Sequence, residues 1–86
     1  MKFDVQVVVS RKEGVSDPEG NTIAEALRRL SFENVESVRV SKLFTISLLA
    51  EDAFSARESA EKVAERVLAN PVIENFKIVD IVECGG

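Results

Sequence analysis

An alternating run from Val35 to Ala50, VESVRVSKLFTISLLA, constrains the fold more than any other stretch. The even positions are mostly apolar and the odd positions mostly polar: Val38, Val40, Phe44, Ile46 and Leu48 against Ser37, Arg39, Ser41, Thr45 and Ser47. This period of two is typical of a strand with one buried face. Strands usually run about 3–10 residues. We therefore expect a strand that bends near Ser41–Lys42 or continues beyond its own subunit.

Lys42 is the exception on the apolar side of this run. Its aliphatic stem could lie along the sheet while the ammonium reaches solvent at the bend. Alternatively, the ammonium meets an acidic group of a partner subunit or reaches a substrate phosphate. Arg39 lies on the polar side of the run and is a second candidate for a partner contact.

The segment before this run predicts a strand, a turn and a helix. Lys2–Ser10 alternates and is interpreted as the first strand. Asp17 can cap a helix that starts at Pro18 and runs to about Leu30. An apolar stripe at helical spacing is expected to face the core; it comprises Ile23, Ala26, Leu27 and Leu30. The turn from Asp17 to Gly20 either serves this helix start or docks a partner.

The last third of the chain predicts a second helix and a final strand. Ser55 and Glu58 match a capping box, and small alanines follow at helical spacing, which would let the helix approach a sheet closely. Asn70-Pro71 ends the helix. Phe76–Glu83 is apolar on both parities, which is typical of a strand that is central or covered on both faces.

The expected fold is one α+β domain over residues 1–86, with the order β-α-β-α-β. Two helices would pack on one face of a small, mainly antiparallel sheet with a long bent central strand. The architecture is ferredoxin-like in character and would be completed by dimerisation, since so short a chain buries little surface alone.

Composition narrows the classes of function. The net charge is −4, which disfavours a nucleic-acid binder, and no apolar run approaches the ~20 residues of a membrane span. The chain has no histidine and one cysteine, Cys84, so we assign no catalytic residue and no metal site. The expected location is the cytoplasm. The terminal Gly85-Gly86 would suit a sulfur carrier. Those carriers, however, begin with a β-hairpin before their helix, whereas here a single strand leads straight into the first helix.

Two sequence blocks carry a family resemblance. The first joins Gly14–Gly20 (GVSDPEG) to the Ala26-Leu27 helix and Val38–Lys42 (VRVSK), and the second is Leu68–Phe76 (LANPVIENF). Together they resemble the PurS subunit of phosphoribosylformylglycinamidine (FGAM) synthase over nearly the whole chain. The family commonly has glycine at the positions of Ser41 and Ser31.

The resemblance implies a non-catalytic role in purine biosynthesis. Such a subunit pairs with itself as a homodimer or tetramer and bridges a PurL-type synthetase and a PurQ-type glutaminase, supporting ammonia transfer. It would bind no cofactor, while the partners would use ATP, Mg and glutamine. The candidate interface residues are Asp17, Pro18, Gly20, Arg39, Lys42, Asn70, Pro71, Val72 and Ile73. The alternative from the residues alone is a small regulatory module that binds a ligand at a dimer interface.

Overall fold

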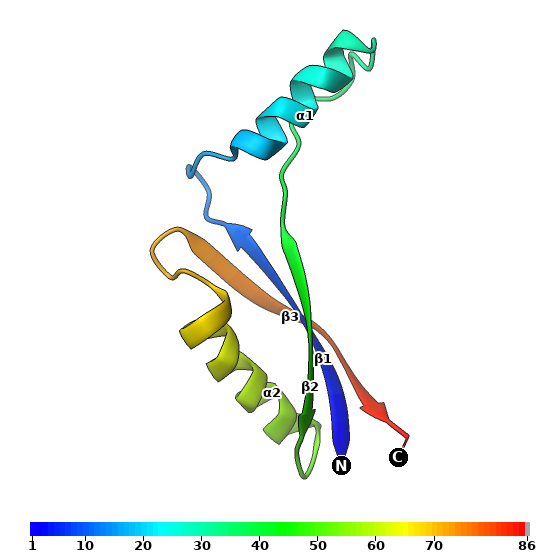
Figure 1. The fold of residues 1–86 in the computed structure, drawn as a ribbon, viewed down its shortest axis with the longest axis vertical. Helices are drawn as coiled ribbons and strands as arrows, with labels where there is room; N and C mark the ends of the chain where they lie inside the picture. Colours follow the sequence, from blue (N-terminus) through cyan, green and yellow to red (C-terminus); the bar gives the residue numbers. More distant parts are fainter. Residues whose placement is uncertain (86) are drawn as a thin grey trace.

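In the computed structural model, which describes residues 1–85, three strands form one antiparallel sheet (Figure 1). The elements are β1 (Lys2–Arg11), α1 (Pro18–Arg29), β2 (Lys42–Leu49), α2 (Ala53–Val63), a π-helical turn η1 (Ala64–Leu68) and β3 (Glu74–Cys84). The strand order is β2-β1-β3. The predicted α+β class and the β-α-β-α-β order are confirmed.

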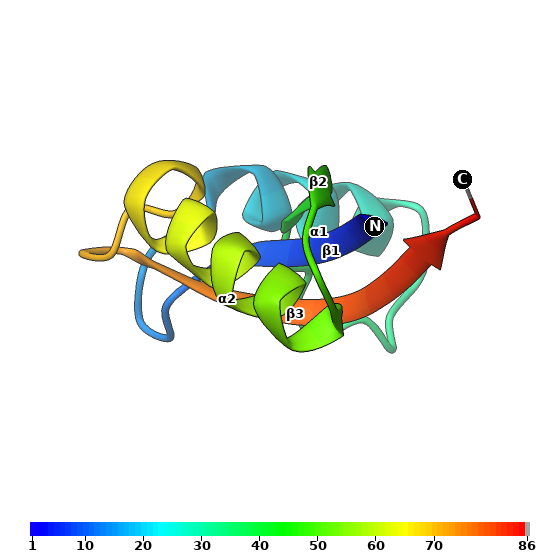
Figure 2. The same cartoon turned by 90° about the horizontal axis from the view of Figure 1, so that it is seen from below.

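The core lies between β1 and α2. Alternate residues of β1 are buried, namely Phe3, Val5, Val7 and Val9, as the period-two pattern predicts. On α2 and η1 the alanines Ala56, Ala60 and Ala64 are fully buried against the sheet. Their small side chains let the helix lie close to the strands. Figure 2 shows α2 beside β1 and β3, against which it packs. Over residues 1–85, neither helix has the length and apolarity needed to cross a membrane.

The prediction of a long central strand over Val35–Ala50 is wrong in two respects. β1 is central and β2 is an edge strand, and β2 begins only at Lys42. The residues before Lys42 do not pair with β1. They lie against the start of α1, because the backbone N–H of Val40 donates to the carboxylate of Asp17. Lys42 pairs with Val9 and so shares the inward face, but it lies at the exposed start of β2.

The prediction that both helices pack on one face of the sheet is not met within a single chain. α2 packs on the sheet, whereas α1 extends beyond the end of β1 and β2 (Figure 1). The α1 stripe that was expected to face the core is largely open: Ile23 is 39 % exposed and Leu30 is 69 % exposed. Gly20 and Ala24 are the buried residues of this helix.

β3 is an edge strand, so the prediction that it is central or doubly covered is wrong. A β-bulge explains why β3 has apolar residues at both odd and even positions. Gln6 pairs with Asp80 and Val7 pairs with Ile78, which leaves Val79 as the extra residue. The inward series therefore changes parity at Val79, from Ile78 to Ile81.

The second helix is capped one turn earlier than predicted. It begins at Ala53, and the carboxylate of Asp52 accepts the backbone N–H of Ser55 at 2.8 Å. Ser55 therefore lies inside the first turn instead of at the cap. Asp and Ser are both good cap residues, so the local sequence alone does not separate the two registers.

Helix α1 ends in a Schellman motif with a serine at the left-handed position. The N–H of Phe32 donates to the carbonyl of Leu27, and the N–H of Ser31 donates to that of Arg28. Ser31 has φ of 72°, a conformation that costs a non-glycine residue free energy.

Replacing Ser31 by glycine should therefore stabilise the protein by roughly 0.5–1 kcal/mol. Urea unfolding at one fixed protomer concentration measures the change. As a control, Ser37→Gly lies in the unpaired segment after α1 and should not stabilise. A Ser31→Gly variant that is less stable than the original chain would contradict the assignment of strain to this residue.

Candidate functional site

The base of α1 is organised by one buried carboxylate. Asp17 is 7 % exposed and is the one buried charged or polar residue within residues 1–85. Its Oδ1 accepts the N–H of Gly20 at 3.0 Å and a guanidinium N–H of Arg11 at 3.2 Å, and its Oδ2 accepts the N–H of Val40 at 2.8 Å. We call Asp17 with Arg11, Gly20 and Val40 the Asp17 joint. It ties the end of β1, the start of α1 and the segment before β2 together.

Glycine at position 20 is required for this joint. A Cβ built on Gly20 would lie 2.1 Å from the carbonyl oxygen of Val38, which is backbone and cannot rotate away. The missing side chain therefore lets α1 lie directly against the segment that precedes β2. Pro18 occupies the first turn, where its missing N–H leaves no donor unsatisfied.

Two arginines hold the rest of this region. The Arg39 guanidinium donates to the carbonyl oxygen of Arg11 at 3.0 Å, and that of Arg28 donates to the carbonyl oxygen of Glu36 at 2.7 Å. Residues 18–41, which we call the arm, are thus fastened to the sheet and folded back on themselves. The arm projects from the sheet as one unit (Figure 1).

The structure places the predicted interface residues in two different roles. Asp17 and Gly20 are buried, and Arg39 bonds to backbone within the chain, so these three build the arm. Pro18 and Lys42 are exposed.

The remaining predicted residues, Asn70 to Ile73, form an exposed corner between η1 and β3. The side-chain oxygen of Asn70 accepts the N–H of Val72 at 3.1 Å, and the Glu74 carboxylate accepts the N–H of Asn70 at 2.8 Å. The backbone N–H of Lys12 donates to the carbonyl oxygen of Ile73 at 2.8 Å. The corner is therefore a fixed turn beside the connection between β1 and α1.

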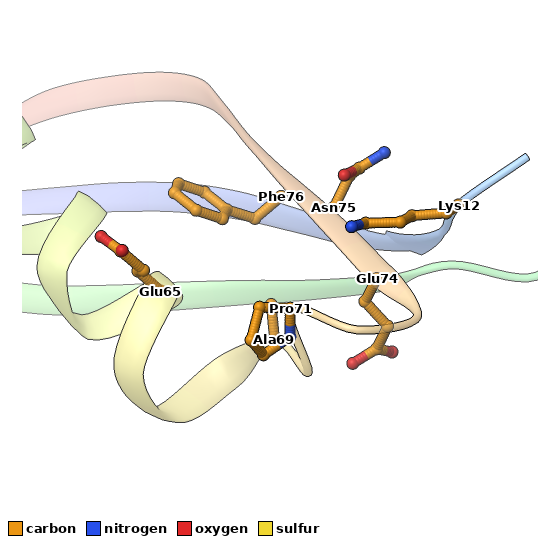
Figure 3. A pocket seen from close by; sticks show the side chains of 7 residues that line it. All are labelled: Lys12, Glu65, Ala69, Pro71, Glu74, Asn75 and Phe76. Carbon is orange, nitrogen blue, oxygen red and sulfur yellow. The ribbon is translucent and has the colours of Figure 1, made fainter.

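A pocket of about 370 Å³ opens beside this corner (Figure 3). It is lined by Lys12, Glu65, Ala69, Pro71, Glu74, Asn75 and Phe76. Of these residues, the sequence predicts only Pro71 as a site residue. Lys12 and Glu65 belong to segments far apart in the chain, and they line the same pocket because α2 and η1 pack on the sheet whose strand β1 ends next to Lys12.

The hydrogen bonds at the Asp17 joint lower the pKa of Asp17 below its ordinary value of 3.8, with the Val40 N–H as the largest cause, followed by that of Gly20. A carboxyl whose pKa is lower in the folded state contributes stability above its unfolded pKa. It loses that contribution as the pH falls through the folded pKa.

The free energy of unfolding should therefore fall between about pH 5 and pH 2, and part of the fall should vanish in Asp17→Asn. Urea unfolding of both chains across this range measures it. The stability difference between them should be largest near pH 7 and shrink in acid. Because Asp4 and Asp52 also have lowered pKa values, the difference between the two chains is the informative quantity. A difference independent of pH would contradict an ionised Asp17 at the joint.

The arm carries an apolar surface that no part of the same chain covers. Ile23, Leu30 and Phe32 are all more than a third exposed. The inward side chains of β2 are only partly buried; they are Phe44, Ile46 and Leu48. The chain thus has an uncovered apolar helix and an incompletely covered apolar sheet face.

Comparison with known proteins identifies chains of the same build. The family described as PurS, phosphoribosylformylglycinamidine (FGAM) synthase, matches residues 4–81. The PurS subunit of this synthase from Archaeoglobus fulgidus is 41 % identical over 73 residues, which cover 85 % of this chain and 91 % of that protein.

Two solved structures show the same fold over nearly the whole chain. PurS from Thermus thermophilus superposes with a TM-score of 0.88 at 30 % identity, covering 99 % of this chain and 100 % of that one. A chain in the structure of PurLQS from Thermotoga maritima gives 0.83 at 30 % identity, covering 92 % of this chain and 96 % of that one.

Proposed function

The chain belongs to the PurS family of phosphoribosylformylglycinamidine (FGAM) synthase, and from this membership we propose that it is the small accessory subunit of that enzyme in purine biosynthesis. The single observation that carries the role is the match, across 92 % of the chain, to a component of the PurLQS structure. In this role the chain bridges a PurL-type synthetase and a PurQ-type glutaminase and supports the transfer of ammonia between them.

The chemistry belongs to the partner subunits in this proposal. The synthetase uses ATP and Mg, and the glutaminase uses glutamine, while this chain binds none of them. This chain has a structural role in the complex, to which it contributes a rigid sheet with a fixed arm. In this proposal the complex works in the cytoplasm.

Self-association follows from the uncovered apolar surfaces. α2 packs mainly against β1 and β3 and leaves much of the inward face of β2 open. In a ferredoxin-like arrangement a second helix occupies that place, but the α1 of this chain points away from it. We propose that α1 of a second copy packs there, and reciprocally, so that a two-fold homodimer buries both surfaces. Burial of apolar side chains supplies the free energy.

Co-assembly tests the bridging role. The chain is mixed with separately purified synthetase and glutaminase subunits, and the mixture is analysed by sedimentation velocity. A three-component species should form, and the two large subunits should not co-sediment when this chain is left out. Stable co-sedimentation of the two large subunits alone would contradict a bridge.

A further inference from the structure

Each of the two uncovered apolar surfaces of the chain begins with one charged residue. On α1, Glu19 lies one turn before Ile23, and Leu30 lies on the same side about three turns after Glu19. On β2, Lys42 precedes Phe44 on the inward face at the period of two. Both charged side chains are exposed, and neither forms an ion pair within residues 1–85. Opposite charges therefore mark the starts of the two surfaces.

The spacing of the residues selects these two charges from the others nearby. Lys42 is the one charged residue of β2. On α1, Glu25 lies two residues after Ile23, which places it on nearly the opposite side of the helix. The Arg28 guanidinium is already bonded to a backbone carbonyl oxygen of its own chain. Arg29 lies six residues after Ile23, about 120° away around the helix.

α1 and β2 both start at the base of the arm. The carboxylate of Asp17 caps α1 and also accepts the N–H of Val40, two residues before Lys42. From this base α1 leads away from the sheet, while β2 runs back along it (Figure 1). A two-fold axis across the base of the arm therefore lays α1 of one copy along β2 of the other, with the two starts side by side.

The two surfaces also match in length. From Glu19 to Leu30 the helix rises about 17 Å, at 1.5 Å per residue. From Lys42 to Leu48 the strand covers about 20 Å, at 3.3 Å per residue. When the two starts coincide, the apolar residues of the helix thus lie over the apolar residues of the strand along the whole contact.

We propose that Glu19 of each copy pairs with Lys42 of the other, so that two symmetric ion pairs fix the direction of α1 on β2; this pair rests on the proposed homodimer. Burial of apolar surface is non-directional and does not by itself choose between the two directions. The reversed placement would set Lys42 against Leu30 and cover its ammonium with an apolar side chain, which costs free energy.

Charge reversal at the two positions tests this pair. The dimer dissociation constant is measured by sedimentation equilibrium at one low salt concentration. Glu19→Lys and Lys42→Glu should each raise it roughly five- to thirtyfold, since each change opposes like charges at both ends of the contact. The double variant restores opposite charges and should return the constant to within about threefold of the original value.

A mixture of the two single variants, one of them isotopically labelled, gives a second readout. Each variant alone opposes like charges in its own dimer, whereas a mixed dimer joins opposite charges in both pairs. Native mass spectrometry should therefore find mixed dimers well above the share that random pairing gives. A pair formed within one chain would produce no such preference.

Glu25→Lys is the matched control, because it makes the same charge reversal on the side of α1 away from Ile23. It should change the dissociation constant by less than about twofold. Mixed with Lys42→Glu, it should form mixed dimers at the random share. Circular dichroism of all variants checks the helix, since Glu19→Lys also removes a favourable charge from the start of α1. The double variant keeps that loss, so its recovery comes from the ion pair.

Two results would overturn the ion pair. Effects of Glu19→Lys and Lys42→Glu that simply add in the double variant mean that the two side chains do not meet. Mixed dimers at the random share mean the same. In both cases a dimeric original chain leaves the proposed homodimer standing. If the original chain is a monomer at micromolar concentration, the homodimer and the ion pair both fail.

Discussion

Replacing Gly20 by alanine should destabilise the protein by about 2–4 kcal/mol, more than any other single methyl group added to α1. The added Cβ would lie 2.1 Å from the carbonyl oxygen of Val38 and 2.9 Å from the carboxylate of Asp17. Neither atom can retreat without breaking the bonds that hold the arm. Urea unfolding at one fixed protomer concentration measures the loss, because the stability of an oligomer depends on concentration.

Asn21→Ala is the matched control, since it places an alanine at the next position of the same helix on an exposed site. It should change the free energy of unfolding by less than about 0.5 kcal/mol. If Gly20→Ala proved as stable as this control, α1 would not lie against the segment before β2. The Asp17 joint would then be wrong.

Replacing Ile23 by glutamate should abolish the homodimer while leaving the fold of the chain intact. Ile23 is 39 % exposed in the chain alone and belongs to the stripe that we place against β2 of a second copy. A carboxylate buried in that contact without a partner should raise the dimer dissociation constant by a hundredfold or more. Glutamate is a better helix former than isoleucine, so α1 itself should not suffer.

Sedimentation equilibrium at micromolar concentration measures this change, with Asn21→Glu as the control. The control adds the same charge to the same helix, two positions away and on the opposite side, and should remain dimeric. An Ile23→Glu chain that stays dimeric would place the contact between copies elsewhere. A wild-type chain that is a monomer at this concentration would contradict the homodimer itself.

The sequence predicts the parts of this fold that depend on local pattern. Period two places Phe3, Val5, Val7 and Val9 of β1 in the core, and helical spacing places the alanines of α2 against the sheet. The helix start at Asp17-Pro18 is likewise where the pattern puts it. These features depend on neighbours in the chain, and the physical chemistry of each is complete within a few residues.

Most of the wrong predictions depend on partners distant in sequence; the cap of α2, at Asp52 instead of Ser55, is a local exception. Alternation in Val35–Val40 is typical of a strand, but the carboxylate of Asp17 takes the N–H of Val40 and Arg39 turns to the β1 end. The apolar stripe of α1 is typical of a core helix, yet no sheet of the same chain lies under it. An apolar stripe predicts that one face of the helix is buried, but it does not show whether the burying surface belongs to the same chain or to a second copy.

The candidate site likewise contains residues that the sequence marks and residues that only the fold brings together. The first sequence block, GVSDPEG, builds a rigid joint, and its most distinctive residues, Asp17 and Gly20, are buried within the chain. The second block builds the exposed Asn70–Ile73 corner and one wall of the pocket. Glu65 and Lys12 carry no pattern that would mark them, because only the fold brings these two distant residues to the same pocket.

The most direct test of the bridging role is glutamine-dependent synthesis by the two large subunits with and without this chain. Free ammonium salt serves as the alternative nitrogen donor. The expected result is that glutamine supports synthesis only when the chain is present, that ammonium supports it in either case, and that Ile23→Glu restores little of the glutamine-dependent rate. Full glutamine-dependent synthesis by the two large subunits alone would contradict the account.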